Sequence, residues 1–396
     1  MPTTAPNIFL SAGEASGEAY GALLLTELKE RCARLGVEPR FFGMGGERME
    51  ALGLERVVRS EDVAVMGITE VIRHMPQIYA EYRKLKDAVR KRRPDVAVLV
   101  DFPDVHLRLA ETFHRLGIPV IFFVSPQLWA WKKGRIRRVR GFVDRMLVIF
   151  PFEEPFYRER EVDATYVGHP LADLALPSIS RESFAEGNGL DPANRWIGLL
   201  PGSRIKEIRL NLPEMVRAAR LLFEQDAATE FLLPVAPTLT MAQVRVVTGI
   251  LTESAAGLPV RMVRDARATL LHARGSIVAS GTATVEAALI GNPFVVVYRV
   301  SPVTYWIAKR VVTVPHVAMV NLVADKRLTP ELIQDDFTAG RIVQELEPLL
   351  ADGAARAEMM AGLAAVAAKL RAGRNGGETA IGAVATIVLE RLGLAK

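Results

Sequence analysis

The sequence contains one cysteine among 396 residues and no long uninterrupted apolar run. Cys32 has no partner within the chain, which excludes a disulfide framework. An apolar stretch at 118–131 is interrupted by Ser125, Pro126 and Gln127, and it is shorter than the roughly 20 residues that a spanning helix needs. The amino terminus lacks the basic region and apolar core of an export signal. These absences predict a protein of the reducing cytoplasm with no spanning segment.

The glycine pattern of a dinucleotide-binding protein is also missing. Neither the glycines at 43, 45 and 46 nor Gly13 with Gly17 completes the Gly-x-Gly-x-x-Gly spacing, which disfavours an NAD-dependent dehydrogenase. Positive charge is present in excess, with a formal net charge of +5 and a pI of about 9.3. This balance favours an anionic partner: nucleic acid, a phosphorylated substrate or an acidic lipid surface. Charge alone does not choose among them.

Short β-branched or aromatic runs alternate with helical patterns, which is typical of parallel α/β layers. Helices are expected at 17–34 and 105–116. One set of predicted strands is 7–11, 95–101, 119–124, 145–149 and 165–167, and a second set is 196–200, 230–234, 260–262, 276–279 and 294–297. A polar stretch with prolines and glycines, at 170–192, separates the sets and predicts the interdomain linker.

We therefore predict an α/β protein with two Rossmann-like, doubly wound domains that face a cleft. With 50% hydrophobic residues, the chain is long enough for two cores. The first domain is expected at 1–172 and the second at 173–370. The Ala-rich end is expected to form consecutive helices, and its last part, 371–396, is a candidate to pack back on the first domain.

Two loops in the second half, at 200–204 and 279–283, end an apolar run with small residues and then open a helical pattern. Each loop places backbone N–H groups at a helix start, where a phosphate can bind. Arg204 adds a guanidinium to the first loop, and Glu286 lies in the helix after the second. Together the loops predict a cradle for a nucleotide diphosphate. Helix capping by Ser280 and Thr282 is compatible with that role because both use the same geometry.

Ligands of open parallel sheets bind beyond the carboxyl ends of the strands, so polar residues at those ends are candidates. After the first predicted strand, Gly13 and Gly17 let the backbone approach a ligand, and Ser16 is a candidate helix cap. Glu18 either serves a ligand or only favours the helix start. The alternative for this whole segment is a tight strand-to-helix turn.

The predicted strand at 95–101 ends in Asp101, which is the candidate general base. Partial burial beside Phe102 would raise its pKa toward a useful range. Asp104 is expected to cap the following helix. Purely structural turn and cap roles for both aspartates fit the spacing equally well. A metal pair is disfavoured, because only His106 lies near in sequence as a third ligand.

Two tryptophans and six cations occupy the segment 129–140. Trp129 and Trp131 with these cations suit a lipid headgroup region, while single-stranded nucleic acid and a solvated basic helix are the alternatives. An earlier apolar stretch, 63–72, includes Met66. Buried core is its expected role, with a surface for acyl chains as the alternative.

Blocks of residues in a common order resemble the lipid A disaccharide synthase family. In the first half they are Gly-Glu-Ala-Ser-Gly-Glu at 13–18, Val-Met-Gly-Ile at 65–68, Asp-Phe-Pro-Asp at 101–104, Ser-Pro-Gln-Leu-Trp-Ala-Trp at 125–131 and Gly-His-Pro at 168–170. In the second half they lie at 200–204, 279–282 with Glu286, 298–299, 306–310 and 321–322. The resemblance covers nearly the whole chain, and its ordered blocks are more specific than any single motif.

The resemblance implies a GT-B glycosyltransferase that joins UDP-2,3-diacylglucosamine to 2,3-diacylglucosamine 1-phosphate, releases UDP and forms a β-1′,6 linkage with inversion. Asp101 would be the base for the acceptor 6-hydroxyl, and Arg204 would stabilise the departing diphosphate. The family's nucleotide site maps onto Ser203, Arg204, Ser280, Gly281, Thr282, Glu286 and Asn321, with Glu286 accepting from the ribose hydroxyls. The acceptor side maps onto Gly13, Ser16, Glu18, Met66, Trp129, Trp131 and His169. His169 either touches substrate or bonds a neighbouring carbonyl.

The chain lacks the Asp-x-Asp pair of metal-dependent transferases, so neither a metal nor a cofactor is expected, and the UDP-sugar is a substrate. It departs from the family pattern at Glu18, where aspartate is usual, and at Val320, where proline is usual. Lipid substrates imply peripheral association with the anionic inner membrane and no nucleic-acid partner, and a homodimer is compatible with the sequence. Two rivals stay open: a UDP-sugar 2-epimerase, which needs no acyl-binding surface, and a non-catalytic nucleic-acid-binding protein, which would leave both glycine loops unexplained.

Overall fold

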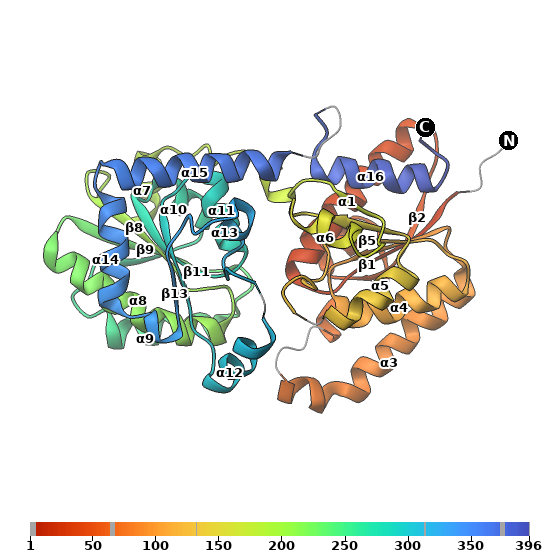
Figure 1. Ribbon diagram of the computed structural model, residues 1–396, viewed down its shortest axis with the longest axis horizontal. Helices are drawn as coiled ribbons and strands as arrows, with labels where there is room; N and C mark the ends of the chain where they lie inside the picture. The colour runs from red at the N-terminus through yellow and green to blue at the C-terminus, as the bar shows by residue number, and fades with distance from the viewer. Residues whose placement is uncertain (1–4, 64–67, 132, 313, 373–376, 396) are drawn as a thin grey trace. The chain divides into compact units, whose positions relative to one another are not determined.

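The structure is a computed structural model that describes residues 5–63, 68–131, 133–312, 314–372 and 377–395. The chain divides into two compact units (Figure 1). Unit 1 extends to Asp173 and resumes at Leu370, and unit 2 is Leu174–Lys369. These divisions lie next to the predicted ones, after residues 172 and 370. In the part of the chain that is described, no helix combines the length and apolar character needed to cross a bilayer.

Unit 1 is built on a parallel sheet of seven strands in the order β3-β2-β1-β4-β5-β6-β7. The strands are β1 (Asn7–Ala12), β2 (Arg40–Gly45), β3 (Glu55–Arg59), β4 (Val96–Val100), β5 (Val120–Phe123), β6 (Arg145–Val148) and β7 (Ala164–Tyr166). Every residue of β4 and β5 is buried. Continuous apolar runs form these strands because helices cover both faces of a parallel sheet.

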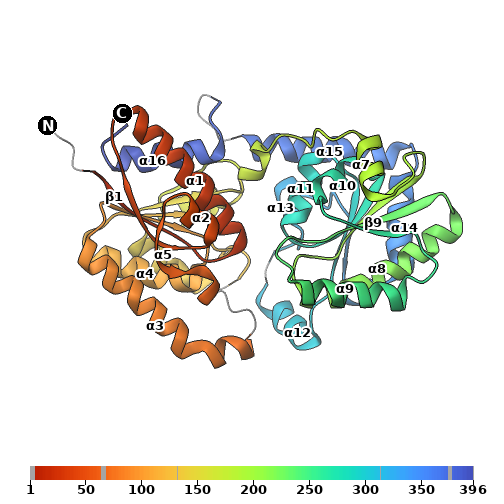
Figure 2. The same ribbon diagram turned by 180° about the vertical axis from the view of Figure 1, so that it is seen from behind.

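The helices of unit 1 are distributed over the two faces of that sheet, with α1 and α16 on one face and α3, α4 and α5 on the other (Figures 1 and 2). They are α1 (Ala15–Arg34), α2 (Glu47–Ala51), α3 (Ile68–Arg92), α4 (Pro103–Arg115), α5 (Ile136–Phe142), α6 (Glu153–Arg158) and α16 (Ala380–Arg391), with single 3-10 turns at Ser60–Asp62, Lys133–Arg135 and Pro170–Asp173. The carboxyl-terminal segment is fixed to α1 through Arg31, whose Nη1 lies 2.6 Å from Thr386 Oγ1 and 3.0 Å from Glu378 Oε1.

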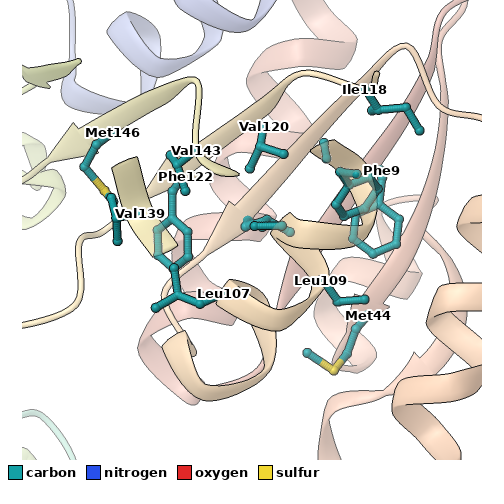
Figure 3. Packing of buried hydrophobic residues seen from close by; sticks show 14 of the residues in the cluster. Phe9, Met44, Leu107, Leu109, Ile118, Val120, Phe122, Val139, Val143 and Met146 are labelled. Carbon is teal, nitrogen blue, oxygen red and sulfur yellow. The ribbon is translucent and has the colours of Figure 1, made fainter. Parts of the chain in front are cut away.

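One hydrophobic cluster of unit 1 lies between the sheet and the helices α3, α4 and α5. Figure 3 shows Phe9, Met44 and Phe122 from the sheet packed with Leu107 and Leu109 of α4. The Phe9 ring meets Phe42 edge-on, with centroids 5.4 Å apart, and it lies 4.9 Å from the centroid of Phe113. Such aromatic pairs add to the burial of apolar surface, so α4 is held firmly over β1 and β4.

Unit 2 repeats the plan with six parallel strands in the order β10-β9-β8-β11-β12-β13. They are β8 (Arg195–Leu200), β9 (Thr229–Pro234), β10 (Val260–Val263), β11 (Gly275–Ala279), β12 (Phe294–Tyr298) and β13 (Glu331–Ile333). The helices are α7 (Arg181–Asn188), α8 (Ile205–Gln225), α9 (Met241–Ser254), α10 (Ala266–His272), α11 (Thr282–Ile290), α12 (Pro302–Val311), α13 (Met319–Ala324), α14 (Ala339–Leu350) and α15 (Ala354–Arg371), with a 3-10 turn at Gln334–Asp336.

The strand order reverses in each unit between its first and fourth strands. In unit 1 this point lies between β1 and β4, and in unit 2 it lies between β8 and β11. Connections leave such neighbouring strands toward opposite faces, which opens a crevice at their carboxyl ends. The loops that begin at Gly13 and Asp101 meet at the first switch point, and those that begin at Pro201 and Ser280 meet at the second.

The prediction of two doubly wound α/β domains is confirmed, and each predicted strand is present within about two residues of its expected ends. Three strands were missed, β2, β3 and β13; β3 and β13 are edge strands with charged residues in them. The expected linker at 170–192 was wrong in part. It contains the helix α7, which Ser180 caps by accepting from Ser183 N, and which Gly189 ends at a φ of 64°.

Candidate functional site

Asp101 lies at the switch point of unit 1, directly after β4, and its side chain faces the first turn of α1. A methyl group at Gly17 would lie 3.5 Å from Asp101 Cβ and 3.4 Å from Val100 O, which is ordinary van der Waals contact, so the first turn of α1 lies directly beside the Asp101 side chain. Asp101 itself is half-buried. The loop after β1 and the carboxylate after β4 therefore share one edge of the sheet.

The backbone at Asp101 and Phe102 is left-handed, with φ values of 53° and 51°. This conformation is unfavourable for residues with a Cβ and needs support from its surroundings. His106 supplies that support: its Nδ1 lies 2.6 Å from Asp101 O, and its Nε2 lies 2.8 Å from Ser11 Oγ. The turn that carries the carboxylate is thus tied to the neighbouring strand β1.

The direction of these bonds follows from the state of the imidazole. Complete burial lowers the pKa of His106 to about 4, so the ring is neutral at physiological pH. A carbonyl oxygen can only accept, so Nδ1 carries the proton and donates to Asp101 O. Nε2 then accepts from the Ser11 hydroxyl. From the sequence His106 was only a candidate metal ligand, and this role could not be predicted because it depends on a contact between residues 95 positions apart.

Gly13 permits a second close approach at the same place. A methyl group there would fall 2.4 Å from the Phe102 ring, closer than any real contact between carbon atoms. The ring therefore lies flat against the backbone of the loop after β1. Gly13 was expected to let the backbone approach a ligand. In the structure the group that approaches this backbone is the Phe102 ring of the same chain.

Two predicted capping roles near this edge were wrong. Ser16 does not cap α1, because the helix starts at Ala15 with Glu14 as its cap residue and Ser16 lies exposed inside the first turn. Asp104 does not cap α4; it lies inside that helix and forms an ion pair with Arg135. Glu18 lies in the first turn of α1, where a negative charge favours the helix start, and its Oε1 also accepts from Arg48 N at 3.3 Å at the start of α2. Packing against the rest of the fold decides at which residue a helix starts, and the local sequence pattern does not contain that information.

The buried carboxylate of Glu153 fixes the loop at 125–131 through hydrogen bonds. Glu153 Oε1 accepts from Ser125 Oγ at 2.7 Å and from Trp129 Nε1 at 3.0 Å, while Oε2 accepts from Phe150 N at 3.1 Å. Burial raises the pKa of Glu153 to about 7 despite these donors. Sequence reasoning missed Glu153, since only the fold brings it beneath a loop from another strand.

Trp129 was predicted to lie on a lipid-facing surface, and its burial shows that this prediction was wrong. Its indole is 8% exposed and points at Glu153, so it cannot lie in a headgroup layer. Trp131 remains 42% exposed. Two of the neighbouring cations are neutralised, because Arg135 pairs with Asp104 and Arg140 pairs with Glu161 at 2.6 Å. Lys132 and Met66 lie outside the described residues.

His169 is 2% exposed, and burial lowers its pKa to about 3. Its Nδ1 accepts from Leu171 N at 3.2 Å, and its ring lies 5.2 Å from that of Phe150. The predicted bond from His169 to a neighbouring carbonyl was wrong in its partner, because Nδ1 accepts from a backbone N–H; the alternative contact with substrate stays a prediction. A neutral ring in this place stabilises the turn that ends unit 1's first segment.

The first loop at the switch point of unit 2 follows β8 and leads into α8, whose first N–H groups have no side-chain cap. Gly202 has a φ of 116°, which a residue with a side chain rarely adopts, and a methyl group there would lie 2.5 Å from Glu207 Oε2. Arg204 is the cap residue of α8 but makes no side-chain cap bond. Its side chain is 51% exposed, with Nη1 3.2 Å from Glu207 Oε1. Ser203 is exposed beside it.

The second loop has the same character. Gly281 is the cap residue of α11 with a φ of 151°, and no side chain caps this helix. Capping by Ser280 and Thr282 was therefore wrong: Ser280 Oγ contacts Val317 O at 3.4 Å, and Thr282 is the first residue of the helix and is exposed. The first N–H groups of a helix have no intrahelical partner, so both loops can donate to an anion.

A buried amide joins the loops around this switch point. Asn211 of α8 donates from Nδ2 to Pro201 O at 3.0 Å and accepts at Oδ1 from Arg299 N at 3.2 Å. It therefore ties the loop after β8 to the residue after β12. Asn211 was not among the predicted residues, and an isolated asparagine in a helical pattern gives no signal for such a role.

Glu286 and Asn321 differ in what they can offer a ligand. Burial raises the pKa of Glu286, and the positive charge of Arg267 opposes this shift. Asn321 is fully buried, and its Nδ2 donates to Thr329 O at 2.9 Å and to Glu331 Oε1 at 2.8 Å, while Oδ1 accepts from Thr329 N at 2.9 Å. Asn321 therefore does not present its amide to a nucleotide. The predicted contact of Asn321 with the nucleotide was therefore wrong. Asn321 has a supporting role instead, because its partner Glu331 also accepts from Val317 N in the segment beside Ser280.

Within the described ranges no group of three or more histidine, cysteine, aspartate or glutamate side chains could hold a metal ion. The switch point of unit 1 carries the Asp101 carboxylate, and that of unit 2 carries the Arg204 guanidinium beside two helix starts, with Glu207 paired to it. This set suits proton transfer and the binding of an anionic leaving group, respectively.

Comparisons with known proteins agree with this chemistry. The family model described as Lipid-A-disaccharide synthetase matches residues 8–382. The chain is 61% identical to the lipid-A-disaccharide synthase of Acidobacterium capsulatum, over 98% of this chain and 97% of the relative. Its fold resembles CalG4, the calicheamicin glycosyltransferase, with a TM-score of 0.60, 18% identity and 99% coverage of both chains. It also resembles UDP-GlcNAc 2-epimerase from Neisseria meningitidis, with a TM-score of 0.62, 10% identity and coverage of 98% and 99%.

The two structural similarities show the fold alone, whereas the family match and the close relative extend over nearly the whole chain. The chain belongs to the lipid-A-disaccharide synthase family and is an enzyme, a glycosyltransferase.

Proposed function

We propose that this enzyme transfers a 2,3-diacylglucosaminyl group from UDP to the 6-hydroxyl of 2,3-diacylglucosamine 1-phosphate. One observation carries the proposal: a held carboxylate stands at the switch point of unit 1, and a guanidinium beside two uncapped helix starts stands at that of unit 2. A sugar transfer from a nucleotide needs both parts, a base for the acceptor and donors for the diphosphate.

The reaction is a single displacement at C1 of the donor sugar. The acceptor O6 forms a bond to C1, the bond from C1 to the β-phosphate oxygen breaks, and the hydroxyl proton passes to Asp101. Attack from the face opposite to the α-linked diphosphate gives the β-1′,6 linkage. We propose that the left-handed turn held by His106 directs the Asp101 carboxylate toward this hydroxyl.

Unit 2 takes the nucleotide in the proposal. Arg204 and the N–H groups that follow Gly202 and Gly281 donate to the departing diphosphate, and no metal ion or cofactor is required for this stabilisation. Glu286 accepts from the ribose hydroxyls. Ser203, Ser280 and Thr282 add hydroxyl donors at the same helix starts.

Both substrates are lipids, so we infer that the enzyme works at the anionic cytoplasmic face of the inner membrane as a peripheral protein. The formal net charge of +5 supports attraction to such a surface. Binding to the membrane can be tested separately from catalysis, since catalysis can be measured with substrates dispersed in detergent.

The decisive experiment incubates the purified protein with both substrates and follows UDP and disaccharide phosphate by mass spectrometry. We expect Asp101→Asn to lower turnover about 10²- to 10⁴-fold, the usual contribution of a general base. Asp104→Asn is the matched control, because Asp104 is an exposed carboxylate three positions further on. Formation of disaccharide by Asp101→Asn at the wild-type rate would remove Asp101 from the mechanism.

The same assay separates a rival activity. A UDP-sugar 2-epimerase would convert the donor alone and leave the acceptor unconsumed. Conversion of the UDP-sugar to its 2-epimer without loss of the acceptor would overturn the proposed transfer. Retention of RNA without UDP binding would instead favour a nucleic-acid-binding protein.

A further inference from the structure

We infer that α12 and the residue after it, Val312, form a contact surface for an anionic lipid bilayer. The inference deepens the proposed function, since it names the surface through which unit 2 would meet the membrane that holds the substrates. It concerns a motif of the sequence, residues 306–310, to which no part of the catalytic mechanism gives a role.

The apolar side chains of this surface are turned outward. Trp306 is 59% exposed, Val311 is 42% exposed and Val312 is 40% exposed. Trp306 is thus the most exposed of the described tryptophans, since Trp196 is fully buried, Trp129 is nearly so and Trp131 is 42% exposed. Tryptophan favours the interface between headgroups and acyl chains, because its ring is apolar and its N–H remains a donor.

Positive charge accompanies this apolar surface. Lys309 and Arg310 are exposed in the last turn of α12, and the sequence has no aspartate or glutamate from Arg299 to Ala324. The Arg310 guanidinium lies 3.5 Å from the centre of the Trp306 ring, and its Nη1 donates to Trp306 O at 2.9 Å. A ring and a cation therefore stand together on one side of the helix, which complements a surface of anionic headgroups.

The helix is already formed by local contacts. Ser301 caps it by accepting from Thr304 N at 3.2 Å, and Pro302 occupies its first position, where proline fits best. In both views α12 lies at the periphery of unit 2, away from its sheet (Figures 1 and 2). A preformed helix loses little conformational freedom on binding, which lowers the entropic cost of a contact with a membrane.

The basic segment of unit 1 is less suited to the same partner. Trp129 is buried over Glu153, and Arg135 and Arg140 are paired with carboxylates. Trp131 is the exposed tryptophan there, which makes it the matched control for Trp306. Both residues are exposed indoles close to cations, and only one of them belongs to α12.

The test measures binding of the full chain to vesicles of phosphatidylglycerol and phosphatidylcholine, and to vesicles of phosphatidylcholine alone, by co-sedimentation. We expect Trp306→Ser to lower the partition coefficient for the anionic vesicles about tenfold, and Trp131→Ser to change it less than about twofold. The double variant Lys309→Ser, Arg310→Ser should bind weakly at low salt and lose most of the salt dependence of the wild type. Equal binding by Trp306→Ser and the wild type would overturn the inference.

Three further measurements keep the outcomes distinct. Activity in detergent should be the same for Trp306→Ser and the wild type; its absence in both would refute the proposed function and leave the vesicle result valid. Light scattering reports the oligomeric state: dissociation of a dimer by Trp306→Ser, with vesicle binding unchanged, would assign the surface to a second copy of the chain and overturn the lipid contact. Equal thermal midpoints establish that the variants are folded.

Discussion

The two units share one strand order and place different chemistry at the same point of it. At the switch point of unit 1 the important groups are side chains: the Asp101 carboxylate, the Phe102 ring and the buried pair of Ser11 and His106. At the switch point of unit 2 they are backbone N–H groups beside Gly202 and Gly281, with Arg204. The topology supplies the position, and the residues that end the strands supply the function.

The units also differ in how they obtain unusual backbone conformations. Unit 2 uses glycine at the positive φ angles of both loops, where no side chain opposes them. At its switch point unit 1 holds two residues with side chains, Asp101 and Phe102, in the left-handed region, a conformation that costs about 1–3 kcal/mol each. A carboxylate cannot be provided by glycine, so unit 1 needs buried hydrogen bonds to offset this strain.

The largest effect is expected from breaking that support. His106→Leu removes the partners of both Ser11 Oγ and Asp101 O, and we expect the free energy of unfolding to fall by about 2–6 kcal/mol, since each buried group left unpaired costs about 1–3 kcal/mol. In folded enzyme, kcat should fall while the KM for the UDP-sugar stays constant. Urea unfolding and steady-state kinetics measure the two effects. His114→Leu, an exposed histidine on the same helix, is the control.

The buried carboxylate of unit 1 should make stability depend on pH. Burial raises the pKa of Glu153 from 4.5 to about 7, so the folded chain keeps a proton that the unfolded chain releases. Its contribution is therefore fully present below pH 4.5 and is lost as pH rises to about 7, with an expected magnitude of about 3 kcal/mol. Glu153→Gln should lose this part of the slope, and Glu154→Gln should keep it. An unchanged slope in Glu153→Gln would contradict the assignment.

The division of labour between the units can be sharpened by measuring UDP binding alone. We expect Arg204→Ala to weaken UDP binding about 10- to 100-fold, because a hydrogen bond to a charged group contributes about 1.5–3 kcal/mol. Asp101→Asn should leave it unchanged, since the base meets the acceptor. Titration calorimetry checks both, with Arg209→Ala on the same helix as the control. Equal losses in the two variants would show that the units do not divide the substrates in this way.

The smallest effect is expected at Gly13, where unit 1 also depends on a missing side chain. Gly13→Ala pushes a methyl group into the Phe102 ring, and overpacking of this kind lowers the free energy of unfolding by about 1–3 kcal/mol. Turnover should fall with it, because the ring adjoins Asp101. Gly134→Ala is the control, since a methyl group there meets nothing within 4 Å. Thermal unfolding and initial rates measure both.

Strand ends and glycine loops could be predicted from the sequence because their signals are local. The buried runs that end at Val100, Leu200 and Ala279 are continuous in the sequence, and the small residues that follow them mark the loops. Two of the four edge strands, β3 and β13, escaped the prediction because they are short and carry charged residues, and the inner strand β2 was missed because it contains two glycines. A strand at an edge buries too little surface to require an apolar run.

Side-chain roles were predicted less well, and the tryptophans show why. Trp129 and Trp131 have the same local context of apolar and basic residues, yet one lies over Glu153 and the other faces solvent. The partner of Trp129 is 24 positions away and reaches it only through the packing of α6 beneath the loop. The amide of Asn321 likewise forms hydrogen bonds with Thr329 and Glu331, which no motif would indicate.

By itself the sequence determined the α/β class, the doubly wound pattern and the positions of Asp101, Arg204 and the two glycine loops, because periodicity and the residues at strand ends are properties of neighbours in the chain. Only the tertiary structure decided which polar groups are buried and what they hold: Ser11 and His106 behind Asp101, Glu153 beneath Trp129, and Asn211 between two loops. The physical reason is desolvation. A buried polar group must find a partner, and the fold chooses that partner from residues far apart in the sequence.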